Sequence, residues 1–457
     1  MLFTTLLFNI YKPLLNDKTD NLLYNETMIN NTKTGNGNNH MGKTKLFNTL
    51  KLIFFCALMG VVSGTVLWLF LKLIQLGTEF LWDKLPGSIN SPIWYPIVIC
   101  TIGGAVIGVF RKCFGDYPQS METVIGTVKK TGSYPYHKII VILVAAALPL
   151  IFGSSVGPEA GMVGVIVALG CWVNENLKFA KENANFYSRV GMAVSLSALF
   201  YSPLFGFFSA VENEDTSPAD DKLKLDHNTQ LLIYGVSIAS SLGILSLLNH
   251  LFGKVSEGFP SFENAQPDKW DLAMAIVYLL CGIALGIFFE KSEEWFEKLS
   301  GIIPPVFSEI LAGFLLGLVV AYLPVVQFSG ENQMAILMTD YAKYAPITMI
   351  GIAFLKILMT NMCIHLGLKG GHFFPVIFSA VCLGYGVSLL VFSMNAAHAT
   401  FAAAITTAAT LSVSMKKPLA VTCLLFLCFP VKMGLWIFLA AILAGQITRS
   451  KDHEEKA

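Results

Sequence analysis

One carboxylate stands alone in a long uncharged stretch of the chain. Glu159 is the only charged residue between positions 139 and 174, in the string Gly153-Ser-Ser-Val-Gly-Pro-Glu-Ala-Gly161. Such a carboxylate in a membrane costs at least about 2–3 kcal/mol, so something must stabilise it. Glycines and Pro158 before an apolar run predict a helix N-terminus, which binds anions. The pattern predicts a tethered anion that moves in and out of an anion site; the alternative is a first-turn carboxylate that only caps its helix.

A second glycine-rich break lies in the other half of the chain, in the string Gly367-Leu-Lys-Gly-Gly-His-Phe-Phe-Pro375. Apart from the histidines at 372 and 398, no charged residue occurs between positions 370 and 415. Gly370 and Gly371 permit close backbone approach before an apolar helix. Together, the two breaks suggest two half-helices that point at one site.

Composition places both breaks in a membrane. Of 457 residues, 54% are hydrophobic and 13% are charged, against about 25% charged in soluble domains, and the mean hydropathy is +0.62. A soluble domain, a disordered chain and a coiled coil are excluded. The net charge of +1 leaves no basic field for nucleic acid. Nine cysteines without Cys/His metal spacing indicate neither a disulfide scaffold nor a metal or cofactor site.

The remaining class is an all-α polytopic membrane protein. Many apolar segments are shorter than the roughly 20 residues of a full span and contain Gly or Pro, which favours broken helices around a site near the midplane. The expected segments are 50–75, 93–110, 139–152, 155–174, 187–212, 229–252, 271–290, 303–324, 346–366, 373–394, 396–413 and 418–447.

Corresponding breaks in the two halves predict an inverted repeat. Lys and Arg concentrate in the N-terminal arm, the 111–138 loop and the tail, so these parts are predicted to be cytoplasmic. The predicted location is a bacterial plasma membrane. The expected parts are a disordered extension (1–48), a first membrane repeat (49–252), a linker (253–270), a second repeat (271–447) and a tail (448–457).

Four strings, in order and spacing, resemble motifs of the CLC chloride channel and transporter family: Gly157-Pro-Glu-Ala-Gly161, Ser202-Pro-Leu-Phe-Gly206, residues 356–360 and Gly371-His-Phe-Phe-Pro375. The resemblance covers residues 50 to 447. It implies a CLC-like inverted-repeat bundle of tilted and broken helices, a homodimer in lipid with one pore per subunit, and permeation by chloride or another small anion.

The resemblance also implies site residues. The gating glutamate falls on Glu159, and backbone donors fall on Glu159, Ala160, Phe373 and Phe374. The full set expected around the anion is Gly157, Pro158, Ala160, Gly161, Gly371, His372, Phe373, Phe374 and Gly115.

The chain departs from the family pattern at several positions. Pro158 replaces the usual basic residue before the glutamate, and the pore serine falls on Gly115. Asp116, beside that glycine, would repel an anion if it faced the pore. The family's pore tyrosine has no counterpart, because Tyr385 is the last tyrosine, and the last family helix is expected to be missing.

Proton coupling stays open at this point. Coupled members carry a carboxylate at the end of the helix that follows Ser202, and the register places Asn213 there, next to Glu212. An amide cannot relay a proton, which favours uncoupled transport, whereas a shift of one residue would restore a carboxylate. Glu212 and Asn213 are the candidate proton path; alternatively Glu212 is a solvated carboxylate at a helix end.

Other classes of function remain as alternatives. One is a fluoride-selective or proton-coupled anion exchanger, which differs in the ion or in its coupling to protons. A cation- or proton-driven solute transporter would use Glu159 as a proton carrier, and a non-transporting scaffold would suit the missing serine, tyrosine and helix. Since no catalytic set is visible, the chain is not expected to be an enzyme.

Overall fold

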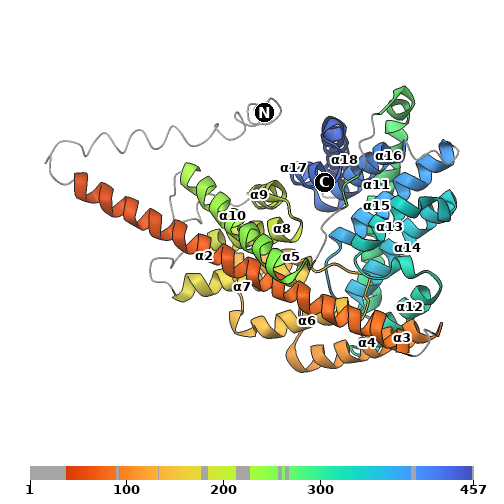
Figure 1. Ribbon diagram of the computed structural model, residues 1–457, viewed down its shortest axis with the longest axis horizontal. Coiled ribbons are helices and arrows are strands. Elements are labelled where there is room, and N and C mark those ends of the chain that lie inside the picture. Colours follow the sequence, from red (N-terminus) through yellow and green to blue (C-terminus); the bar gives the residue numbers. More distant parts are fainter. Residues whose placement is uncertain are drawn as a thin grey trace. The chain divides into compact units, whose positions relative to one another are not determined.

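The computed structural model describes residues 38–88, 92–131, 133–176, 184–212, 227–255, 260–262, 267–392 and 398–454. Within them the chain is almost entirely helical (Figure 1). The first-half helices are α2 Asn38–Thr78, α3 Leu85–Ser88, α4 Tyr95–Phe114, α5 Met121–Thr131, α6 Ile139–Ile151, α7 Glu159–Asn176, α8 Ala184–Leu199, α9 Pro203–Val211 and α10 His227–Phe252. The second-half helices are α11 Lys269–Ser300, α12 Phe307–Tyr322, α13 Glu331–Asp340, α14 Pro346–His365, α15 Phe373–Val391, α16 Ala399–Met415, α17 Pro418–Cys428 and α18 Gly434–Glu454.

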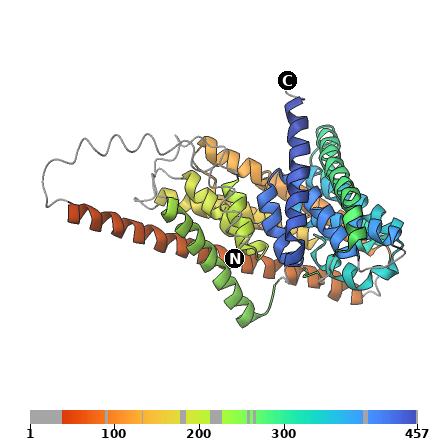
Figure 2. The ribbon, with the colours of Figure 1, turned by 90° about the horizontal axis from the view of Figure 1, so that it is seen from above.

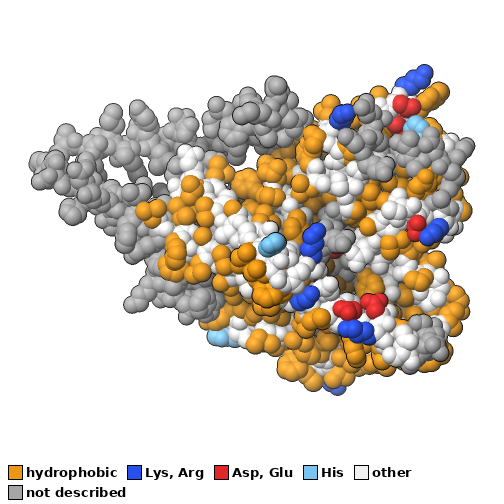
Figure 3. Space-filling model, in the orientation of Figure 1, with side chains coloured by type: hydrophobic (Ala, Val, Ile, Leu, Met, Phe, Trp, Pro, Cys, Tyr) orange, Lys and Arg blue, Asp and Glu red, His pale blue; other side chains and the backbone are white. Residues whose placement is uncertain are grey.

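The fold is the predicted all-α membrane bundle. Among the described residues six helices are long and apolar enough to cross a bilayer, and shorter apolar helices such as α7, α16 and α17 accompany them. The face in Figure 3 is mostly hydrophobic, with few and scattered charged side chains. The protein is therefore an integral, multi-pass membrane protein.

Several helices differ from the expected apolar segments. The segment 418–447 is two helices, because Pro430 lacks the N–H that would continue α17. Helices α5 and α13 were not expected, since their charged residues break the apolar runs. Helix α2 begins at Asn38, within the extension predicted for 1–48. The division into two repeats stays a prediction.

From Phe55 onward the chain forms one compact unit, and small residues set its helix spacing. A Cβ on Gly104 of α4 would lie 2.2 Å from the carbonyl oxygen of Glu309, and one on Gly313 of α12 would lie 2.1 Å from that of Cys100. Helices α4 and α12 therefore pack backbone to backbone, as small residues allow within membranes (Figure 1). Figures 1 and 2 show α11–α16 on one side of the unit and α7–α10 on the other.

Polar contacts join α9 to α17. Glu212 at the end of α9 accepts hydrogen bonds from the N–H groups of Leu419 (3.0 Å) and Ala420 (2.9 Å), at the start of α17. In the other direction, Lys417 donates to the carbonyl oxygen of Ser209 at 3.2 Å. A carboxylate at a helix N-terminus and an ammonium near a helix C-terminus both complement the helix dipole.

Lys356 in α14 is completely buried. Its ammonium donates to the carbonyl oxygens of Val326 (2.8 Å), Gln327 (3.3 Å) and Phe328, in and just after the short 3₁₀ turn Pro324–Val326. Phe328 in turn donates its N–H to the carbonyl of Gly153, at 3.5 Å. The lysine thus fixes a loop that lies against the first glycine-rich break.

Replacement of this lysine by methionine tests that role. Lys356→Met keeps most of the side-chain volume but leaves buried carbonyls without a donor, and hydrogen bonds to charged groups contribute about 1.5–3 kcal/mol each. We expect a clear fall in the thermal unfolding midpoint in detergent. Lys343→Met, which removes an exposed lysine paired with Asp340, is the control and is expected to change little. An unchanged midpoint in Lys356→Met would contradict the assigned role.

Candidate anion-binding site

The two glycine-rich breaks meet as the sequence predicted. Gly157 and Gly371 exchange backbone hydrogen bonds in both directions, each at 2.7 Å, as an isolated antiparallel bridge. Helix α7 starts two residues after the first of these glycines, and α15 starts two residues after the second. Two helix N-termini from opposite halves of the chain therefore begin side by side within the bundle.

The Glu159 side chain crosses from one half-helix to the other. Its Oε1 accepts the N–H of Phe373, the first residue of α15, at 2.7 Å, although Glu159 itself is the first residue of α7. The residue is 3% exposed. Its Oε2 is buried and has no hydrogen-bond partner among the described residues. The carboxylate is thus an anion bound at a helix N-terminus.

Only glycine leaves room for this carboxylate. A Cβ on Gly157 would lie 2.0 Å from Oε2 of Glu159, and one on Gly371 would lie 2.0 Å from its Cδ. Both distances are far inside van der Waals contact. The glycines are therefore required by the position of the carboxylate as well as by the bridge.

The other residues of the predicted set lie at various distances from this point. His372 stands at the N-cap position of α15 and, like Ala160, lines the cavity described below. The backbone N–H of Phe374 is a further donor to the Glu159 carboxylate, as predicted, while its ring stacks on that of Phe200 with the two ring centroids 4.7 Å apart. Gly161 faces Ala146 of α6, and Pro158 directly precedes the first turn of α7.

A cavity of about 800 Å³ leads to Glu159. Its lining includes Ala160, Gly370, Gly371, His372 and Phe373 at the inner end, and side chains from the last turns of α11, the start of α12 and the loop after α4. Asp116 and Pro118 of that loop line it. Gly115, the predicted serine equivalent, is not among the lining residues, and its N–H is bonded to the carbonyl of Arg111 at 2.9 Å.

Asp116 does not stand as an unpaired negative charge. It accepts hydrogen bonds from Arg111 Nε (3.0 Å) and from Lys369 Nζ (2.6 Å). Partial burial acts to raise the pKa of Asp116, but its hydrogen bond and ion pair with Lys369, followed by the charge of Arg111, outweigh burial and hold that pKa below its ordinary value. Arg111 also pairs with Glu309, which is 2% exposed. No sequence pattern predicts these pairs, because Lys369 and Glu309 are about two hundred or more positions from their partners.

The candidate proton path is placed only in part. Both carboxylate oxygens of Glu212 accept N–H groups at the N-terminus of α17. Glu212 is not among the residues that line the cavity. Asn213 lies outside the described residues. The lining does include two ionisable side chains not predicted to meet, Glu293 and His365, whose Oε1 and Nε2 are 3.6 Å apart.

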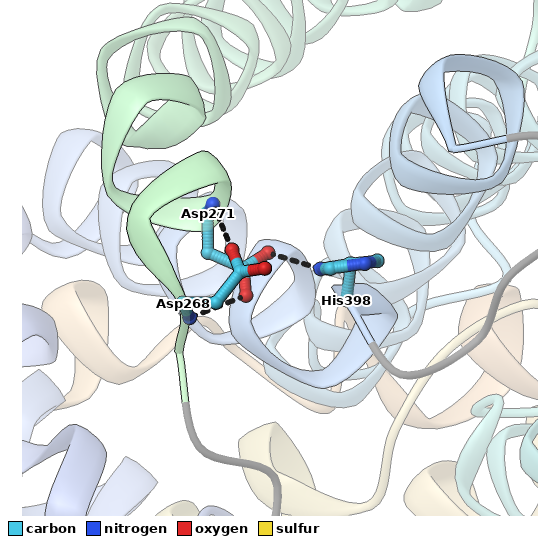
Figure 4. Close-up of side chains that lie close together, drawn as sticks. All are labelled: Asp268, Asp271 and His398. Carbon is cyan, nitrogen blue, oxygen red and sulfur yellow. Dashed lines mark hydrogen bonds and ion pairs between the residues drawn. The ribbon is translucent and has the colours of Figure 1, made fainter.

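A second cluster of polar side chains lies away from the cavity (Figure 4). Asp268 and Asp271 form a capping box at the start of α11, and Asp271 Oδ1 lies 3.0 Å from Nδ1 of His398, which precedes α16. The hydrogen bond from the backbone N–H of Asp271 is the main reason that the pKa of Asp268 lies below its ordinary value. The three side chains have donor types that suit a divalent cation, but their oxygens already bind helix N–H groups and the histidine. The cluster serves to join α11 to α16.

These features define a class: a membrane protein of broken helices in which two half-helix N-termini share one buried carboxylate. The sequence model of the family described as Voltage gated chloride channel matches residues 103–449. The chain therefore belongs to the CLC family, whose members are ion channels or transporters and not enzymes.

Relatives agree with this assignment. The chain is 25% identical over 362 residues to chloride channel protein CLC-e of Arabidopsis thaliana, which covers 72% of this chain and 48% of the plant protein. It is 24% identical over 340 residues to the protein YfeO of Escherichia coli O6:H1, covering 71% of this chain and 76% of YfeO. The chain thus spans about half the length of the plant relative.

Solved structures share the fold. A CLC-type fluoride/proton antiporter matches with a TM-score of 0.69 at 18% identity, covering 88% of this chain and 96% of that one. A slow cyanobacterial Cl⁻/H⁺ antiporter matches with a TM-score of 0.73, also at 18% identity, covering 88% and 94%. The all-α, CLC-like bundle predicted from sequence is thereby confirmed as the fold class.

A methyl group at position 371 tests the geometry of the site. Gly371→Ala places a Cβ inside the Glu159 carboxyl group, so we expect the carboxylate to leave the α15 N-terminus, with a loss of about 1–3 kcal/mol of stability. The measurement is thermal unfolding combined with structure determination of the variant. Gly351→Ala in α14, where a Cβ meets no atom within 4 Å, is the control. A variant with Glu159 still bound to Phe373 would contradict the packing described here.

Proposed function

We propose that this protein moves small anions across the membrane and that Glu159 gates the movement. The observation that carries the proposal is the Glu159 carboxylate bound to the N–H of Phe373 at the start of α15. A transported anion would use the same backbone donor and the same helix dipole. Anion and carboxylate therefore compete, and the anion passes when the side chain swings away.

Chloride is the default ion. The support is family membership together with a site that offers backbone N–H groups and no basic side chain in contact with Glu159 among the described residues, which suits a weakly hydrated monovalent anion. Fluoride is the second candidate, because one solved structure of the same fold is described as a fluoride/proton antiporter and because glycine stands at the pore serine position here.

We propose that transport does not require proton exchange. Both oxygens of Glu212 accept helix N–H groups, an environment that favours the ionised carboxylate and opposes proton uptake. The alternative is an exchanger, as both antiporters of the same fold are described. Its proton route would have to be found elsewhere along the cavity.

The finer parts of the assignment are proposals as well. We propose a homodimer in the lipid bilayer of a bacterial plasma membrane, with both termini and the 111–138 loop on the cytoplasmic side, as the distribution of Lys and Arg indicates. On this orientation the cavity beside Arg111 and Asp116 opens to the cytoplasm. The two membrane repeats, 49–252 and 271–447, each supply one half-helix.

Substitution of the glutamate tests the gate. In liposomes loaded with chloride, wild-type efflux is expected to rise as the pH falls, because protonation releases Glu159 from the α15 N-terminus. Glu159→Ala is expected to raise efflux at neutral pH by at least about fivefold, equivalent to ~1 kcal/mol, and to abolish the pH dependence. Chloride efflux and internal pH are recorded together.

The control is Glu79→Gln, which removes an exposed carboxylate paired with Lys84 and is expected to behave as wild type. If the chloride gradient drives proton movement, the protein is an exchanger and the uncoupled mechanism is wrong. Efflux and pH dependence unchanged in Glu159→Ala would remove the gating role. A folded protein that moves neither chloride nor fluoride would favour the scaffold alternative.

A further inference from the structure

The cavity that leads to Glu159 carries its own pair of cations near its exposed end. Of the described residues that line it, Arg111 and Lys369 are the arginine and lysine members, while Asp116, Glu159, Glu293, Glu297 and Glu309 are acidic. Both cations bind the same carboxylate, that of Asp116, whose side chain is 59% exposed. An anion that enters this cavity therefore meets one favourable place, and a side chain of the protein occupies it.

The two carboxylates around Arg111 are not equivalent. Glu309 is 2% exposed, and its Oε2 also accepts the N–H of Val306 at 2.6 Å, in the first turn of α12. A buried pair of this kind is costly to break by removal of one partner. Asp116 is 59% exposed, and its partners Arg111 and Lys369 are 20% and 25% exposed, so water competes for this carboxylate as it does not for Glu309. Glu309 thus fixes the Arg111 side chain permanently, whereas Asp116 is free to exchange.

We propose that Arg111 and Lys369 form a second binding site for a small monovalent anion, which the Asp116 carboxylate fills when no anion is present. The ligand would displace Asp116 from Lys369 Nζ and from Arg111 Nε and take over its hydrogen bonds. The charge balance supports this exchange. Glu309 neutralises Arg111, so the site carries one net positive charge, that of Lys369, when Asp116 moves away. One monovalent anion would neutralise it.

The position of Lys369 connects this site to the inner one. Lys369 lies two residues before Gly371, which is bridged to Gly157, and four before Phe373, which holds Glu159. The segment that presents the cation is therefore the segment that leads into α15. The chain would hold two tethered carboxylates on one route, Asp116 at the exposed end and Glu159 at the buried end, each on an anion site.

A plain structural role predicts the opposite behaviour. If Asp116 only ties the loop after α4 to the break before α15, its loss should loosen the cations and weaken anion binding. If Asp116 competes with the anion, its loss should strengthen binding. The inference rests on the proposed anion transport for its meaning, but anion binding can be measured without transport.

The experiment is isothermal titration of chloride into the purified full chain in detergent, with Glu159 intact so that its own carboxylate fills the inner site. Asp116→Asn is expected to bind chloride about two- to fivefold more tightly than wild type, the range that corresponds to loss of competition by a partly exposed carboxylate. Lys369→Gln and the double variant are expected to lack this gain. Asp340→Asn, which breaks the exposed pair with Lys343, should match wild type.

The possible results separate the two proposals. Chloride binding in Asp116→Asn that is equal to or weaker than wild type overturns the second site, and so does tighter binding that persists in the double variant. A wild-type protein that binds chloride but moves none overturns the proposed function without touching this inference. Since Asp116 is largely exposed, the asparagine variant is expected to fold, and Lys369→Gln gives an independent comparison.

Discussion

A single buried carboxylate has to be accommodated in an apolar bundle, and the surrounding structure follows from that requirement. The Glu159 carboxylate is accommodated there because α15 offers it an N–H group and the positive end of a helix dipole. That donor belongs to the opposite half of the chain, so the two breaks must be held together, as the bridge between Gly157 and Gly371 does. Both breaks must also lack side chains at these positions, because the carboxyl group fills the space. The proposed gating and the packing thus require the same residues.

The rest of the bundle keeps the two helix N-termini in register. Lys356 holds the loop at Phe328, which contacts the first break. Glu212 and Lys417 exchange polar contacts between α9 and α17. Helices α4 and α12 approach backbone to backbone. Each of these contacts joins the first half of the sequence to the second, so neither half-site has a stable position without the other.

The sequence predicted the meeting of the two glycine-rich breaks at Glu159, but not the ion pairs beside them, and the difference has a physical reason. Glu159 stands out because its neighbours are uncharged over a long stretch, and glycine and proline mark where helices start. These are local signals. The ion pairs of Arg111 with Glu309 and of Lys369 with Asp116 depend on packing between distant segments, and no periodicity encodes them. Helix α5 was missed because its charges hide a short helix that hydropathy alone does not detect. The predicted proton path is placed only at Glu212, where the side chain has a capping contact that its position next to an acidic loop did not suggest.

The contact between Glu159 and Phe373 also has a consequence for biosynthesis. The two residues are 214 positions apart, so at about 5–20 residues per second a ribosome needs roughly 10–40 s to make the donor after it has made the acceptor. During that interval α7 carries a carboxylate with no second half to receive it. The segment must wait in protonated form, or beside water or the insertion machinery, until α15 emerges. The site in the first half of this protein therefore cannot be completed until α15 of the second half has been made.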